Sequence, residues 1–100
     1  MNFNQVIDYI NVNIKDNKLN LTYRLRSLTQ PEKLNILRYV GDNYPNLQEL
    51  HLSSNEIISL DNSLNNLVNL QKLYLWYNRI SLIQIYNYVI STENLTEISY

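Results

Sequence analysis

Two stretches of sequence decide the fold of this chain: Leu47-Gln-Glu-Leu50-His-Leu52-Ser-Ser-Asn55-Glu-Ile57 and, 23 residues later, Leu70-Gln-Lys-Leu73-Tyr-Leu75-Trp-Tyr-Asn78-Arg-Ile80. Both read L-x-x-L-x-L-x-x-N-x-I, and every matched position has the same offset. A third copy begins further on, where Leu95 and Ile98 take the places of Leu47 and Leu50. Such a fixed period is typical of a repeat architecture, in which each unit covers the core of its neighbour.

The spacing within each copy predicts a short strand followed by an inward turn. Side chains two residues apart in a strand point to the same side, so Leu50 and Leu52 are expected to face the core. Asn55 and Asn78 follow at the turn, where buried backbone groups need both a donor and an acceptor, and a short amide side chain supplies both. We therefore expect Asn55 to stack on Asn78 and interpret the repeated residues as core and turn.

This pattern resembles the leucine-rich repeat family, and the resemblance covers the C-terminal half of the chain. It implies an α/β fold: a short leucine-rich repeat solenoid with parallel strands on a concave face, helices on the convex side and a helical N-terminal cap. We expect the cap in residues 1–45 and the repeats in residues 46–100, with units 47–69 and 70–94 and a partial unit 95–100. The family also implies that outward-facing strand side chains contact a protein partner.

The N-terminal half carries helix and strand patterns of its own. Apolar side chains recur at helical spacing in residues 2–15, and residues 19–25 alternate apolar with polar side chains, which favours a strand over the alternative helix. Thr29 and Glu32 are spaced for a capping box at the start of a second helix. Gly41, the only glycine, is predicted to end that helix in the left-handed conformation. We expect this helix on the convex side, in an irregular repeat ahead of the first complete one.

The composition limits the available chemistry. The chain has no cysteine and one histidine, so no disulfide, thiolate nucleophile or Cys/His metal cluster is available, and no cofactor is expected. Without a Ser/His/Asp set or a Gly-rich phosphate loop, we predict that it is not an enzyme. A net charge of -1 argues against nucleic acid and anionic membranes as partners. No segment approaches the ~20 apolar residues of a spanning helix or resembles a signal peptide, so we expect a cytoplasmic protein.

The predicted concave face carries the candidate protein-binding residues: Glu49, His51, Lys72, Tyr74, Trp76 and Tyr77. Three large aromatic side chains at exposed positions leave apolar surface in water, and Trp and Tyr are common interface anchors. The alternative is that the aromatic side chains cover the short third strand as part of a C-terminal cap. Glu49 and Lys72 form, with Glu97, a ladder of alternating charge that we interpret as a solvated structural feature. His51 lacks a reactive partner in the motif, which favours a surface contact over catalysis.

These patterns together predict a non-enzymatic module that binds a protein partner through its concave face. The alternative is a self-assembling structural protein that pairs through its C-terminal strand, with a homodimer as the simplest product. A third hypothesis is an adaptor that binds one protein through residues 1–45 and another through the repeats, as ubiquitin-ligase substrate receptors do. Nothing in those residues resembles an F-box, which argues against the adaptor.

Overall fold

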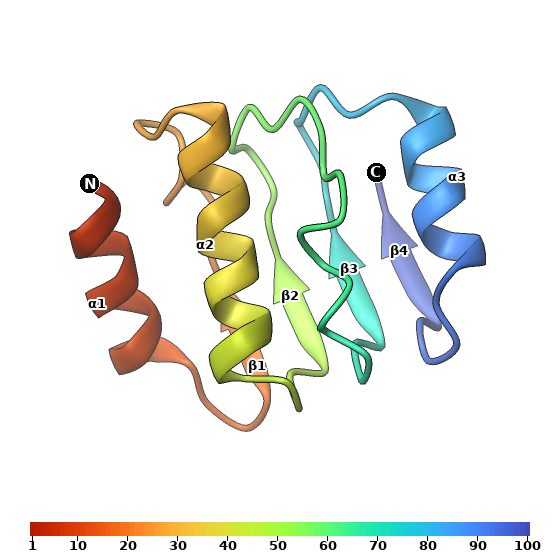
Figure 1. Ribbon diagram of the computed structural model, residues 1–100, viewed down its shortest axis with the longest axis horizontal. Helices are drawn as coiled ribbons and strands as arrows, with labels where there is room; N and C mark the ends of the chain where they lie inside the picture. The colour runs from red at the N-terminus through yellow and green to blue at the C-terminus, as the bar shows by residue number, and fades with distance from the viewer.

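The strands of the chain form one parallel sheet, with one helix over a face of the sheet and the other two toward its two ends (Figure 1). The computed structural model describes residues 1–100. In chain order the elements are α1 (Phe3–Asn13), β1 (Lys18–Asn20), α2 (Gln30–Asn43), β2 (Glu49–His51), β3 (Lys72–Tyr74), α3 (Leu82–Ile90) and β4 (Glu97–Ser99). The strands lie in the order β1-β2-β3-β4, each parallel to the next. The predicted α/β arrangement of stacked parallel strands and convex helices is confirmed.

Equivalent residues of successive repeats lie side by side across the sheet. Leu50 pairs with Leu73, and Leu73 pairs with Ile98, as the sequence offsets predict. The row continues into the N-terminal half, where Leu19 of β1 pairs with Leu50. β1 and α2 therefore belong to an irregular repeat ahead of the first complete one. That residues 1–45 act as a cap stays a prediction.

The hydrophobic core is a single cluster of 21 buried residues that runs from α1 to α3. The leucines at the repeat positions of the two complete units are buried, as predicted: Leu47, Leu50, Leu52, Leu60, Leu64, Leu67, Leu70, Leu73 and Leu75. The last layer is less enclosed, because Leu95 and Ile98 are only partly buried. α3 directs Ile85 and Tyr88 into the core and leaves several apolar side chains on its outer side.

The helices begin where the local sequence predicts. At α1, Asn2 and Gln5 form a capping box in which each side chain accepts from the backbone N–H of the other, at 2.9 and 2.8 Å. Thr29 and Glu32 form the predicted capping box at the start of α2. Neither these helices nor α3 combine the length and apolar character that crossing a bilayer requires.

The first strand is shorter than predicted. β1 ends at Asn20, whereas the alternating pattern predicted a strand over residues 19–25. The Asn20 side chain accepts a hydrogen bond from the backbone N–H of Thr22 at 2.9 Å, and Tyr23 has a φ of 65°, so the chain turns at this point. The turn still carries two apolar side chains of this segment into the core: Leu21 and Leu25.

The prediction for Gly41 is wrong. α2 continues past this residue to Asn43, Tyr44 takes the C-cap position, and the glycine has no positive φ. Gly41 is buried, and a Cβ at this position would lie 3.0 Å from the Cβ of Asn66. The glycine therefore permits a close approach of α2 to the next segment of the chain, rather than a reversal of the backbone.

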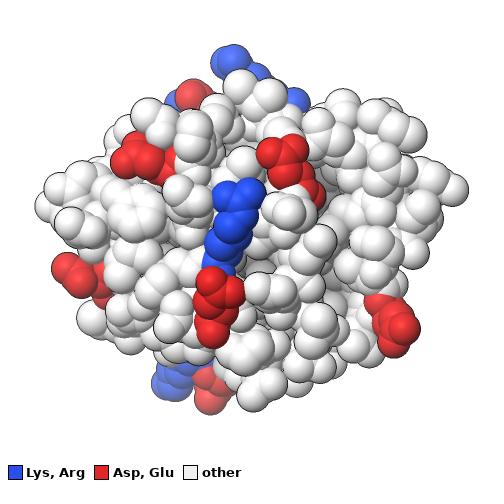
Figure 2. Space-filling view, in the orientation of Figure 1, with Lys and Arg blue, Asp and Glu red and all other residues white.

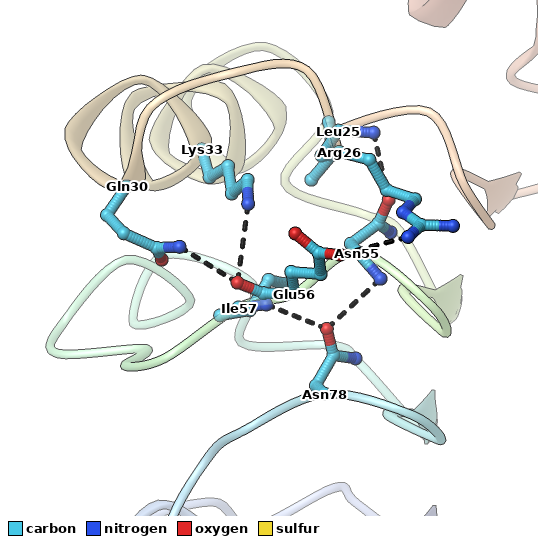
Figure 3. A network of polar contacts seen from close by, with 8 residues as sticks. All are labelled: Leu25, Arg26, Gln30, Lys33, Asn55, Glu56, Ile57 and Asn78. Carbon is cyan, nitrogen blue, oxygen red and sulfur yellow. Dashed lines mark hydrogen bonds and ion pairs between the residues drawn. The ribbon is translucent and has the colours of Figure 1, made fainter.

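The Asn78 side chain hydrogen-bonds to the turn after β2, in the repeat that precedes its own (Figure 3). Its Oδ1 accepts from the backbone N–H groups of Ile57 at 2.9 Å and Asn55 at 3.2 Å. Its amide nitrogen donates to the carbonyls of Leu52 at 2.9 Å and Leu75 at 3.1 Å. One side chain thus supplies both donors and acceptors to backbone groups of two layers.

Asn55 repeats this arrangement one layer earlier, where it is fully buried. Its Oδ1 accepts from the Leu25 N–H at 2.9 Å, and its amide donates to the carbonyls of Leu21 and Leu52. The predicted stacking of Asn55 and Asn78 is confirmed. We call the pair the asparagine ladder; in it, each side chain completes the turn of the preceding layer.

Candidate protein-binding surface

The concave face of the sheet carries a first row of four charged residues. The register aligns Lys18, Glu49, Lys72 and Glu97 on adjacent strands. The predicted ladder of three alternating charges therefore has a fourth member, which β1 supplies. Cross-strand pairs of opposite charge at such positions contribute about 0.2–1 kcal/mol each, so the row supports the register of the sheet only modestly.

The second row of the concave face is centred on His51 and Tyr74, which are paired across β2 and β3. Their rings stack with centroids 4.4 Å apart and planes 18° apart. His51 Nε2 lies 2.8 Å from Glu49 Oε2, and the Tyr74 hydroxyl donates to the carboxylate of Glu97. The hydrogen bond from His51 lowers the pKa of Glu49, and the bond to Glu97 raises the pKa of Tyr74 to about 12. Both rings are therefore held in place by the chain itself.

Trp76 and Tyr77 follow β3 but take different positions. The Trp76 carbonyl accepts from the Ser54 N–H at 2.8 Å, which extends the ladder of strand hydrogen bonds, and its side chain is 50% exposed. Tyr77 has a φ of 59° and is 84% exposed beyond the end of the strand. Of the three predicted aromatic residues, only Tyr74 hydrogen-bonds to β4. That the six predicted residues bind a protein partner stays a prediction.

The turn after β1 adds surface residues that the repeat pattern did not predict. Tyr23 is 62% exposed and occupies the same position after its strand as Ser54 and Tyr77. Arg26 Nη2 lies 2.9 Å from Glu56 Oε1, and this hydrogen bond lowers the pKa of Glu56. The spacing of the strand leucines in the irregular first repeat is the signal that could have located these residues.

The surface provides stacking and hydrogen bonding. His51 is engaged by Glu49 and Tyr74. No three side chains of the metal-ligating types come close enough together to hold a metal ion. The concave face therefore carries the stacked rings of His51 and Tyr74 beside a row of alternating charges.

The family model for leucine-rich repeats (2 copies) matches residues 45–99, which is more than half of the chain. The chain therefore belongs to the leucine-rich repeat family, as the sequence pattern and the stacked parallel strands indicate. A comparison with curated proteins found no match. Leucine-rich repeats generally mediate contacts between proteins, and the family is typically non-enzymatic.

Proposed function

We propose that this chain is a protein-interaction module whose concave face binds a protein partner. The observation that carries the proposal is the fixed pair of rings of His51 and Tyr74 beside the half-exposed Trp76. Side chains that are already held in place lose little conformational entropy when a partner covers them. Glu49 and Lys72 border the rings and provide a polar rim. A cytoplasmic location remains part of this proposal.

The test is capture of a partner from cells of the source organism, followed by titration of the purified partner against variants of the full chain. We expect Trp76→Ala to weaken binding by more than about 1 kcal/mol, as truncation of an interface anchor does. Tyr86→Ala is the matched control, because it removes an exposed aromatic side chain from α3 on the convex side. Equal affinity of Trp76→Ala and the wild-type chain contradicts the proposal.

Self-assembly is a second candidate function, and the exposed side of α3 favours it. The helix leaves four apolar side chains in water: Leu82, Ile83, Tyr86 and Ile90. Few charges lie over α3 in the space-filling view of the convex side (Figure 2). β4 is an outer strand of the sheet, with one side not paired to another strand. A second copy that paired with β4 would cover both features.

Light scattering over a dilution series tests self-assembly. If the second candidate holds, the mean mass rises with concentration, and Ile83→Glu keeps the chain monomeric because it places a charge on the apolar side of α3. Val12→Glu, at an exposed position on α1, is the matched control and should associate as the wild-type chain does. A wild-type chain that stays monomeric at high concentration rules this candidate out.

A further inference from the structure

A hollow lies beside the concave face, where the chain leaves the strands. Tyr23, Ser54 and Tyr77 each stand three residues after a strand, and each has a left-handed backbone, with φ of 65°, 61° and 59°. Because the middle residue is a serine, space remains between the two exposed tyrosines. Such a backbone costs a non-glycine residue about 1–3 kcal/mol and is found preferentially at functional sites, where the surrounding structure enforces it.

The backbone beneath the hollow is held firmly (Figure 3). The carbonyl of Glu56 accepts from Gln30 Nε2 at 2.8 Å and from Lys33 Nζ at 3.3 Å. The next backbone N–H donates to Asn78 Oδ1 at 2.9 Å. The carboxylate of Glu56 pairs with Arg26 at 2.9 Å. The backbone that forms the base of the hollow is therefore held in place without a ligand, which reduces the entropic cost of binding one.

The charges around the hollow are mainly positive. Arg26 and Arg79 line it and the buried Lys33 lies beneath, whereas Glu56 is its only carboxylate. Arg26 is paired with Glu56, but the side chain of Arg79 forms no hydrogen bond or ion pair within the chain. The pKa of Lys33 is lowered mainly by burial, and the charges of Arg26 and Arg79 lower it further while Glu56 opposes them. An unpaired guanidinium and two exposed phenol rings thus line the same hollow.

We propose that this hollow binds an acidic peptide segment of the protein partner, with a carboxylate on Arg79 and adjoining side chains against Tyr23 and Tyr77. This inference rests on the proposed function and adds the chemistry of the partner. A guanidinium presents parallel N–H donors that match the two oxygens of a carboxylate. The phenol rings offer apolar contact area at small entropic cost. Because Trp76 directly precedes Tyr77, a peptide in the hollow continues onto the concave face.

The charge balance favours a carboxylate over a nucleic acid. Nucleic acids are bound through many phosphates along a basic surface. The whole chain has a net charge of -1, and the hollow has one unpaired arginine. A single carboxylate needs only one guanidinium, and Arg79 is the arginine of the hollow that Glu56 does not pair with.

Selection from a phage-displayed library of random peptides, with the full chain as bait, tests the inference. We expect the selected peptides to be enriched in Asp and Glu over the starting library. A fluorescein-labelled selected peptide should bind about ten- to a hundredfold more weakly to Arg79→Ala, because charge-assisted hydrogen bonds are lost. Glu56→Gln should bind it about two- to fivefold more tightly, since this change removes the competing carboxylate and frees Arg26. Arg38→Ala, on the exposed side of α2, is the matched control and should leave the affinity unchanged.

The outcomes separate this inference from the proposed function. One outcome overturns the inference and supports the concave-face proposal: the selected peptides lack acidic enrichment, and their affinity is lower for Trp76→Ala but unchanged for Arg79→Ala. A library that yields no binder overturns the inference, whereas the concave-face proposal is decided by the titration of the purified partner against Trp76→Ala. Tighter binding of a labelled single-stranded DNA than of any selected peptide also overturns the inference, in favour of a nucleic-acid site. Urea unfolding checks that each variant is as stable as the wild-type chain. If Arg79→Ala is unstable, Arg79→Lys replaces it, because lysine keeps the charge but not the paired donors.

Discussion

The asparagine ladder predicts a large stability loss for Asn55→Ala. The substitution removes three hydrogen bonds from a fully buried site. Two of the backbone partners keep another donor: the Leu52 carbonyl still accepts from Asn78, and the Leu21 carbonyl still accepts from the Arg24 N–H. The Leu25 N–H alone is left without an acceptor. One orphaned buried donor and two lost hydrogen bonds give an expected loss of about 2–5 kcal/mol, a large part of the stability of an ordinary domain.

Urea unfolding followed by circular dichroism measures this loss. Asn65→Ala is the matched control, because Asn65 is exposed and we expect a change within about 0.5 kcal/mol. Asn55→Asp keeps the acceptor for the Leu25 N–H but turns a carboxylate toward two carbonyls. We expect it to be at least as destabilising at neutral pH and to recover partly on acidification, when the protonated group can donate. A loss below about 1 kcal/mol for Asn55→Ala, with an unchanged m value, would refute the assigned role of the ladder.

Three further predictions concern single positions. The buried Tyr88 hydroxyl has no hydrogen-bond partner, and burial raises its pKa from 10.0 to about 12, so the folded chain retains a proton that the unfolded chain loses. Thermal melts should therefore show that the wild-type chain loses stability as the pH rises from 10 toward 12, and that Tyr88→Phe is no less stable at neutral pH and loses less at high pH. The pKa of Glu49 is lowered from 4.5, so its contribution to stability is lost as the pH falls through that lowered value; melts of Glu49→Gln should show a smaller acid loss. Gly41→Leu should lower the unfolding free energy by about 1–3 kcal/mol in urea titrations, because the side chain meets Asn66; a neutral result would contradict the close approach.

The complete repeats could be predicted from sequence because their leucine spacing specifies which side of each strand faces inward. Leu50 and Leu73 occupy neighbouring strands at the predicted register, and the outward positions beside them follow by alternation. The positions of His51 and Tyr74 on the concave face follow from the same alternation. Their stacking and their bonds to carboxylates depend on side-chain rotamers, which the spacing does not specify. Their role in partner binding stays a prediction.

The remaining features depend on contacts between residues that are distant in sequence. The paired residues of β1 and β2 are further apart in sequence than the paired residues of the other strands, because α2 lies between Leu19 and its partner Leu50. Gly41 has two possible uses, a left-handed turn or a close approach, and only the position of Asn66 decides between them. Tyr77 leaves the concave face through a positive φ that few tyrosines adopt, and the alternation of strand positions does not predict it.

The asparagine ladder has a direction, and that direction bears on the synthesis of the chain. Asn55 completes the turn after β1, and Asn78 completes the turn after β2, so each turn depends on a residue that the ribosome adds later. In an emerging chain, the turn after the most recently synthesised strand therefore has backbone groups without hydrogen-bond partners. These groups find their partners only when the following repeat has left the ribosome. We expect protease resistance of stalled nascent chains to appear in steps, each step one repeat behind the point of synthesis.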